Sequence, residues 1–146
     1  MARVVAVCLS ERKGVAKRNV GEAEVKENHG LVGDAHAGDP ERQVSLLPLE
    51  SINRMRERGF EVGPGSFAEN LTVEGLDFSV LGRGVRLEVG EVLLEISQVG
   101  KVCPEPCEVS KRIGVCIMPR EGVFARVLRG GRIRVGDAVR VLGAPG

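Results

Sequence analysis

The chain has 146 residues, a length typical of one folded domain with one core, so we expect residues 1–146 to form a single domain. Its 21 Lys and Arg residues nearly balance its 20 Asp and Glu residues, and Trp and Tyr are absent, which argues against a nucleic-acid-binding surface of cations and stacked aromatics. No apolar run approaches the roughly 20 residues that span a bilayer, and the N-terminus lacks signal-peptide features, so we expect a cytoplasmic protein without membrane contact.

The first half of the chain predicts strands and one short helix. Residues 4–10 form a Val-rich apolar run typical of a strand buried on both faces. Residues 22–27 alternate weakly and predict a second strand, after which residues 29–40 are dense in turn-forming residues. Residues 43–47 predict a third strand. Residues 48–59 begin with proline, carry apolar residues at threefold spacing and end on glycine, which together predict a helix.

The second half of the chain is also rich in short Val, Leu and Ile runs. Apolar residues in 123–128 fall at i, i+1, i+4 and i+5, which predicts a second short helix ended by the glycine pair that follows. Many short strands with glycine-rich turns and about two short helices favour a mostly β fold, built as a closed or nearly closed β-barrel. The further predicted strands are residues 70–74, 85–89, 92–97, 133–135 and 138–142.

A cysteine-rich segment lies between a predicted strand and the second predicted helix. It contains Cys103, Cys107 and Cys116, with Lys101 and Arg120 close in sequence. The thiolate is the reactive and metal-binding form of cysteine, and nearby cations lower the pKa of a thiol. Loops at strand ends also tend to carry functional groups. We therefore expect the chemistry of the protein to involve this segment.

Two other interpretations of the cysteines remain open. Three thiolates and a histidine would suit tetrahedral zinc, but the spacing C-x3-C-x8-C differs from the paired C-x2-C of zinc knuckles. Cysteine is also a common core residue, and we expect this of Cys8, which lies inside the first predicted strand.

Four segments, in this order, resemble the MOSC family of molybdenum-cofactor-associated domains. Together they extend over nearly the whole chain, and the resemblance implies a mostly β barrel that binds the molybdenum cofactor, molybdopterin. The segments are residues 30–36 (GLVGDAH), 42–47 (RQVSLL), 67–76 (FAENLTVEGL) and 94–98 (LEISQ), the last of which leads to Cys103.

The resemblance also implies roles for individual residues. Cys103 falls on the family cysteine that ligates molybdenum or handles sulfur, and Lys13 matches an early basic loop that meets the cofactor phosphate. Arg42 and Asn70 lie within matched motifs near the pterin site, whereas His36 is expected to be a turn residue. The remaining candidates are two cofactor-binding cations and two supporting thiols: Lys101, Arg120, Cys107 and Cys116.

The leading functional hypothesis is a protein that binds the molybdenum cofactor or handles its sulfur during cofactor maturation or transfer. Its expected partners are molybdenum cofactor biosynthesis or sulfurase proteins, with Cys103 as the molybdenum ligand or persulfide carrier. One alternative is reduction of small N-hydroxylated molecules at a cysteine-bound molybdenum. Another is a structural, cysteine-ligated metal site in a partner-binding module.

Overall fold

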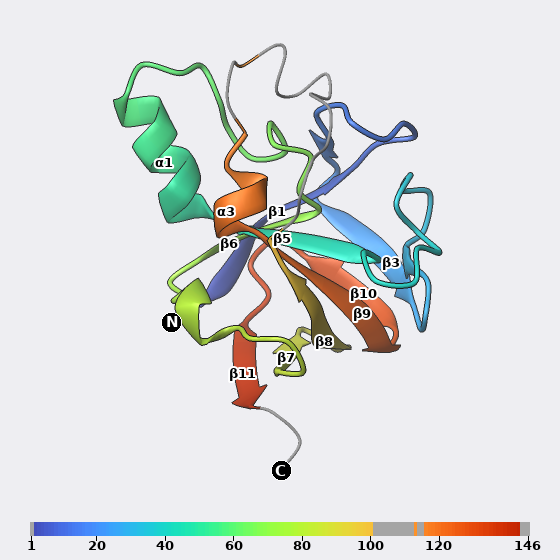
Figure 1. The fold of residues 1–146 in the computed structure, drawn as a ribbon. Coiled ribbons are helices and arrows are strands. Elements are labelled where there is room, and N and C mark those ends of the chain that lie inside the picture. Colours follow the sequence, from blue (N-terminus) through green and yellow to red (C-terminus); the bar gives the residue numbers. More distant parts are fainter. Residues whose placement is uncertain (1, 101–112, 114–115, 144–146) are drawn as a thin grey trace.

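The computed structural model describes residues 2–100, 113 and 116–143 and shows a mostly β fold in two sheets (Figure 1). All neighbouring strands are antiparallel except β5 and β6, which run parallel. The large sheet has the order β11 (Val139–Gly143), β7 (Arg86–Val89), β8 (Val92–Val99), β9 (Val123–Arg129), β5 (Val44–Pro48), β6 (Leu71–Glu74), β1 (Arg3–Leu9) and β2 (Arg18–Asn19). The small sheet has the order β10 (Gly131–Arg134), β3 (Glu22–Lys26) and β4 (Gly30–Leu31).

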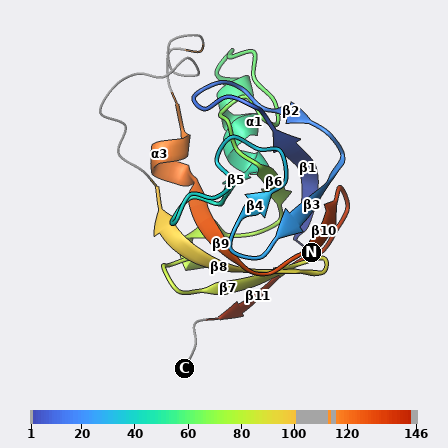
Figure 2. The same ribbon diagram turned by 90° about the vertical axis from the view of Figure 1, so that its right-hand side faces the viewer.

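Two α-helices and one 3-10 turn accompany the strands in the described residues. Helix α1 (Leu49–Glu57) confirms the helix predicted after Pro48, and it buries Ile52 and Met55 as the threefold spacing requires. Helix α3 (Met118–Glu121) and the 3-10 turn η1 (Phe78–Val80) are each less than two turns long. Figures 1 and 2 place α1 and α3 at one end of the molecule, away from β7 and β11. None of the described helices is long and apolar enough to cross a bilayer.

The second predicted helix is wrong, because residues 123–129 form strand β9. This strand lies between β8 and β5 in the middle of the large sheet. Val123, Phe124 and Ala125 are all buried, since both faces of the sheet are covered here. A strand buried on both faces shows no alternation of polar and apolar residues. The apolar residues of β9 therefore also fell at the spacing expected for one face of a helix. The mostly β class with two short helices is nevertheless confirmed.

The expected β-barrel is not confirmed, because neither sheet closes on itself within the described part of the chain. The large sheet starts at β11 and ends at β2. The start of β1 contacts the start of β11 through an isolated bridge between Arg3 and Ala138, and Val139 N–H donates to Ala2 O at 3.0 Å. Strand β10, which precedes β11, pairs with β3 in the small sheet instead. The turn between β10 and β11 thus meets the start of β1 without extending it into a ladder.

Two apolar cores cover opposite faces of the large sheet. The larger core contains Leu46, Leu71 and Ile96, and the smaller one contains Leu47 and Phe124 beside α1. Leu46 and Leu47 are neighbours on β5 and enter different cores, as expected from the twofold periodicity of a strand. Each fully buried Leu or Phe contributes about 1.5–3 kcal/mol relative to an exposed side chain. The central strands are therefore fixed from both faces.

One row of residues crosses β8, β9, β5 and β1 and includes Asn70, which directly precedes β6, near the end of the sheet that carries the helices. Gln98 on β8 is opposite Phe124 on β9, and Phe124 is opposite Ser45 on β5. The row continues through Asn70, whose backbone N–H donates to Ser45 O (3.1 Å), to Cys8 on β1, whose N–H donates to Asn70 O (2.6 Å). Paired residues on neighbouring strands share a face of the sheet. The polar groups described next lie against this row.

Candidate functional site

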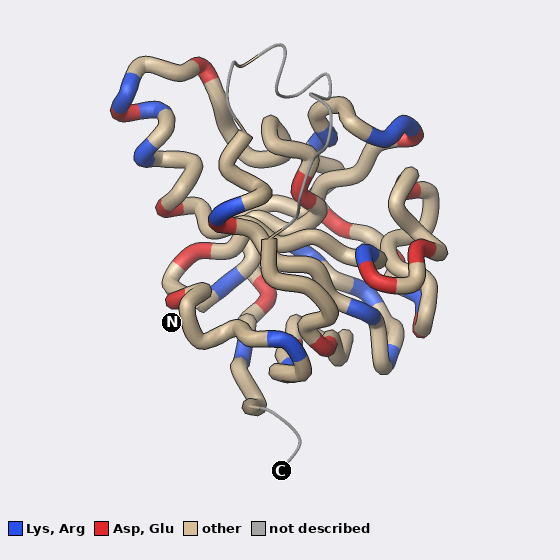
Figure 3. The backbone as a smooth tube through the Cα atoms, viewed as in Figure 1, with Lys and Arg blue, Asp and Glu red and all other residues tan. Residues whose placement is uncertain are grey.

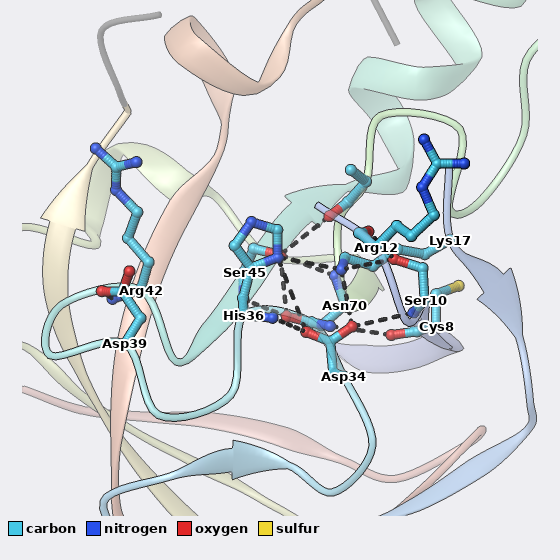
Figure 4. Close-up of polar contacts among 11 residues, drawn as sticks. Cys8, Ser10, Arg12, Lys17, Asp34, His36, Asp39, Arg42, Ser45 and Asn70 are labelled. Carbon is cyan, nitrogen blue, oxygen red and sulfur yellow. Dashed lines mark hydrogen bonds and ion pairs between the residues drawn. The ribbon is translucent and has the colours of Figure 1, made fainter. Parts of the chain in front are cut away.

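A buried ion pair between Lys17 and Asp34 lies at the C-terminal end of β1 (Figure 4). Lys17 Nζ is 2.8 Å from Asp34 Oδ1, and both side chains are 0% exposed. The same nitrogen is 3.3 Å from Ser10 Oγ and 3.2 Å from His36 Nδ1. Ser10 Oγ in turn donates to the carbonyl oxygen of Arg12 at 2.8 Å. The three N–H groups of the ammonium thus have three neighbours within hydrogen-bonding distance.

The carboxylate of Asp34 is held ionised by its surroundings. Burial alone would raise its pKa, but the hydrogen bond and charge of Lys17, with hydrogen bonds from Ser10 N–H and the Asn70 side chain, lower the pKa below its ordinary value. The backbone N–H of His36 also donates to Asp34 Oδ2 at 3.2 Å. A buried charge needs such compensation, and in this cluster each of the two opposite charges has its counter-charge and several hydrogen-bond partners.

A glycine lets the loop that carries Lys17 approach its neighbour. Lys17 N–H donates to Gly65 O at 2.9 Å. Gly65 has φ +88°, and a Cβ at this position would lie 2.1 Å from Lys17 O. Only glycine fits both the backbone conformation and the space. The segment that follows α1 therefore helps to place Lys17 beneath the row of strand residues.

Asn70, directly before β6, is fully buried, and its side chain links β5 with β1. Its Oδ1 accepts from Ser45 N–H (2.9 Å) and Ser45 Oγ (3.1 Å), and its Nδ2 donates to Cys8 O (3.0 Å). Cys8 is buried, which confirms that it is a core residue. Burial, and to a smaller extent the negative charge of Glu69, raises the pKa of its thiol to about 12. Asn70 therefore holds the neighbouring backbone segments together beneath the cluster, and its amide oxygen already accepts two hydrogen bonds.

Arg42 lies on the same face of the sheet, at the point where β8 leads into the cysteine segment. Its Nε donates to Gln98 Oε1 at 3.2 Å, and its guanidinium lies 5.6 Å from the ring centroid of Phe124. Its terminal nitrogens form no hydrogen bond to another residue in the described ranges. The guanidinium is thus held on one side by an amide and an aromatic ring, with its other donors left to bind an anion.

Lys13 and Arg42 act on the same acidic residue, Asp39. Burial opposes ionisation of Asp39, but hydrogen bonds from the backbone N–H groups of Glu41 and Arg42, and then the charges of Arg42 and Lys13, lower its pKa. Lys13 itself is exposed. Two of the cations predicted from the sequence are therefore brought into one neighbourhood. Figure 3 shows that acidic and basic residues are otherwise interspersed over the molecule.

Of the other predicted site residues, some line a pocket between α1 and α3 and the rest lie outside the described part of the chain. Cys103, Cys107 and Lys101 lie outside the described residues. Cys116 and Arg120 line a pocket of about 340 Å³ between α1 and α3, together with Arg54 and Arg58. Among the described residues, no three His, Cys, Asp or Glu side chains are grouped to hold a metal ion.

Sequence reasoning missed Lys17, Asp34 and Ser10 as members of the site. His36 lies in a turn as expected, but its ring also contacts Lys17. A lysine in a charged loop gives no sign that it will be buried. The available signal was the matched segment 30–36, which contains both Asp34 and His36 in a turn-rich stretch.

Comparison with solved structures shows what the fold is similar to. The YuaD protein of Bacillus subtilis is 19% identical with a TM-score of 0.78, and the match covers 100% of this chain and 98% of that one. YiiM of Geobacillus stearothermophilus is 21% identical with a TM-score of 0.76, covering 97% of this chain and 75% of that one. YiiM of Escherichia coli is 20% identical with a TM-score of 0.71, covering 99% and 71%. These likenesses show a shared fold.

Comparison with family models identifies the chain more directly. A search of the curated proteins finds no match. The model of the MOSC domain, in contrast, matches residues 33–140, which include Asp34, His36, Arg42 and Asn70. This range is well over half of the sequence and extends across most of both sheets. The chain therefore belongs to the MOSC domain family.

Proposed function

We propose that this chain binds the molybdenum cofactor beside the cysteine segment and serves in cofactor maturation or transfer. Lys13 and Arg42 would hold the cofactor phosphate, and Cys103 would act as the molybdenum ligand or persulfide carrier. Membership of the MOSC family, which is associated with molybdenum cofactor, supports the class of ligand. The partners would be proteins that make, sulfurate or receive the cofactor.

The observation that carries the proposal is the fixed guanidinium of Arg42. Its contacts with Gln98 and Phe124 use Nε and one face of the group, so the terminal nitrogens keep the fork geometry that suits a phosphate. Exposed Lys13 adds a second cation in the same neighbourhood, as its influence on Asp39 shows. The donor set therefore fits a phosphorylated ligand.

The position of Arg42 also connects this phosphate site with the predicted sulfur. Gln98, which holds Arg42, is at the end of β8, and its Nε2 donates to Gly100 O at 2.9 Å. The chain then enters the segment that contains Cys103. When bound, the cofactor would supply a molybdenum atom with an affinity for soft thiolate ligands. The residues of this chain would bind and orient the phosphate, exclude competing anions and present the thiol.

The test is the content of protein made in a host that synthesises the cofactor. The wild type should carry pterin, detected as its fluorescent oxidation product, and molybdenum or persulfide, detected by mass spectrometry. Arg42→Gln should lower pterin content roughly ten- to hundredfold, because a hydrogen bond to a charged group contributes about 1.5–3 kcal/mol. Arg83→Gln is the matched control, since Arg83 is exposed and lies in the loop after η1.

A second comparison separates the thiol from the phosphate contact. Cys103→Ala should remove molybdenum or persulfide, while Arg42→Gln should remove pterin together with them. The proposal is abandoned if the wild type contains neither pterin, molybdenum nor persulfide. It is also abandoned if the variants at Arg42 and Arg83 retain equal amounts of pterin.

A further inference from the structure

We propose that two adjoining cavities beside α1, η1 and α3 form a binding site for an amphipathic carboxylic acid, with its carboxylate among arginines and its apolar body beside η1. Neither Lys13 nor Arg42 lines these cavities, so the site is separate from the phosphate contacts proposed above. Arg120, predicted above as a cofactor-binding residue, would hold this acid instead. Binding here would not depend on the molybdenum cofactor.

The smaller cavity, of about 340 Å³, lies between α1 and α3, which are side by side in Figure 1. Among the described residues that line it, Arg54, Arg58 and Arg120 are accompanied by one carboxylate, that of Glu121. Glu121 Oε1 is paired with Arg54 Nη2 at 2.7 Å. Arg58 and Arg120 form no ion pair with any residue that the structure describes. An added carboxylate would therefore match an excess of cationic donors in this cavity.

Two of these arginines are held by neutral groups as well. Arg54 Nη2 donates to Ser51 Oγ at 3.1 Å, and Ser51 is buried. The Nε and Nη1 atoms of Arg54 form no hydrogen bond within the described ranges. The guanidinium of Arg58 lies 5.7 Å from the ring centroid of Phe60, a contact that leaves its charge without a counter-ion. Both groups thus keep donors for a ligand.

The backbone that carries the charged groups of α3 is fixed. Arg120 N–H and Glu121 N–H donate to Ile117 O at 3.1 Å and 2.8 Å. Gly100 N–H, just after β8, donates to Gly122 O at 2.9 Å. Helices α1 and α3 also contribute to the same smaller apolar core, which fixes their separation. Donors that are positioned before the ligand arrives need less ordering on binding, which favours affinity.

The larger cavity, of about 590 Å³, has the surface for the apolar part of the ligand. It shares Ser51, Arg54, Arg120 and Glu121 with the smaller cavity, so the two are continuous around these residues. Both volumes are in the range of about 300–1,000 Å³ that is typical of small-molecule sites. The apolar residues that line the larger cavity are Leu76, Phe78, Leu81, Val99 and Val123.

The charges of the larger cavity determine which way the acid would lie. Beyond the residues that the two cavities share, its described ionisable side chains are Glu50 and Asp77, both acidic. Each already accepts one backbone hydrogen bond, from Gly75 N–H and Ser79 N–H, both at 2.9 Å. Like charges would repel a carboxylate here. The carboxylate is therefore expected in the arginine-lined cavity and the apolar body beside η1.

Isothermal titration calorimetry with straight-chain probes tests both halves of the site. We expect octanoate to bind, and the affinity to fall roughly two- to fourfold for each methylene removed in hexanoate and butyrate. 1-Octanol has the same apolar chain without the charge and should bind roughly tenfold more weakly. The proposal is overturned if octanoate does not bind, if affinity is independent of chain length, or if octanol binds as tightly as octanoate.

Arg120→Gln assigns the carboxylate contact, because Arg120 is exposed and has no ion pair to lose within the described residues. We expect octanoate affinity to fall roughly tenfold in this variant and to recover in part in Arg120→Lys. Arg56→Gln is the matched control, since Arg56 is also exposed, lies on α1 and lines neither cavity. Equal octanoate affinities in Arg120→Gln and Arg56→Gln overturn the assignment.

Val99→Ser assigns the apolar contact, since Val99 is 59% exposed and its replacement leaves the core intact. We expect octanoate affinity to fall roughly two- to fivefold and butyrate affinity to stay close to wild type. Unchanged octanoate affinity, or an equal loss for both acids, overturns this placement. Loss of pterin in Arg120→Gln contradicts a separate site. A wild type without pterin refutes only the function proposed above, because octanoate binding is measured without cofactor.

Discussion

Replacing Lys17 with methionine removes the ammonium from the buried cluster and leaves the carboxylate of Asp34 without its charged partner. The two side chains are 0% exposed and 2.8 Å apart. Breaking a buried ion pair by removing one partner typically destabilises a protein by about 3–5 kcal/mol. Asp34 keeps hydrogen bonds from Ser10 N–H (3.1 Å) and His36 N–H (3.2 Å). We therefore expect a loss near the lower limit, about 3 kcal/mol in the free energy of unfolding.

Urea unfolding of four proteins measures this loss and assigns it to the pair. The set consists of the wild type, Lys17→Met, Asp34→Asn and the double variant, compared at constant pH with matched slopes. Each single variant leaves one buried charge uncompensated, whereas the double variant removes both. The double variant should therefore lose at least about 1.5 kcal/mol less than the sum of the single losses. A loss under about 1 kcal/mol in Lys17→Met, or strict additivity, refutes the reasoning.

Three further predictions concern the same region. The stability that the pair gives should be present above pH 3.8, the ordinary pKa of Asp34, and disappear as the pH falls through its lowered folded-state pKa. The gap between wild type and Lys17→Met in urea should therefore shrink on acidification, and a constant gap would contradict this. Gly65→Ala should cost more than about 2 kcal/mol, because φ is +88° and the new Cβ meets the backbone. The matched control Gly63→Ala has no atom within 4 Å of its Cβ and should change stability by less than about 1 kcal/mol, and similar thermal unfolding of the two variants would count against the argument. The Cys8 thiol, with its pKa raised to about 12, should resist alkylation at neutral pH until the chain unfolds, which peptide mass spectrometry can follow; labelling of the folded protein at the rate of an exposed thiol would disprove it.

The site residues predicted from motifs are marked by their neighbours in the sequence, whereas those found only in the structure depend on contacts with distant parts of the chain. Lys13 and Arg42 are cations within or beside matched segments, and the structure brings both close to Asp39. Lys17 has no such signal, because its burial depends on a contact with a loop distant in sequence. Its backbone N–H bonds to Gly65 O, and its side chain bonds to Asp34. A contact of this kind forms only when strands β1, β5 and β6 are assembled.

The strands show the same distinction between local and long-range information. The sequence by itself determined most strand positions and α1, because runs of Val, Leu and Ile bounded by turn formers are local patterns. It also determined the family, through ordered segments that the MOSC model matches. Only the tertiary structure decided that β9 is a strand and that Lys17, Asp34 and His36 form one cluster. The physical reason is that burial on both faces of a sheet removes local periodicity, and an ion pair between two loops is set by the strands that bring them together.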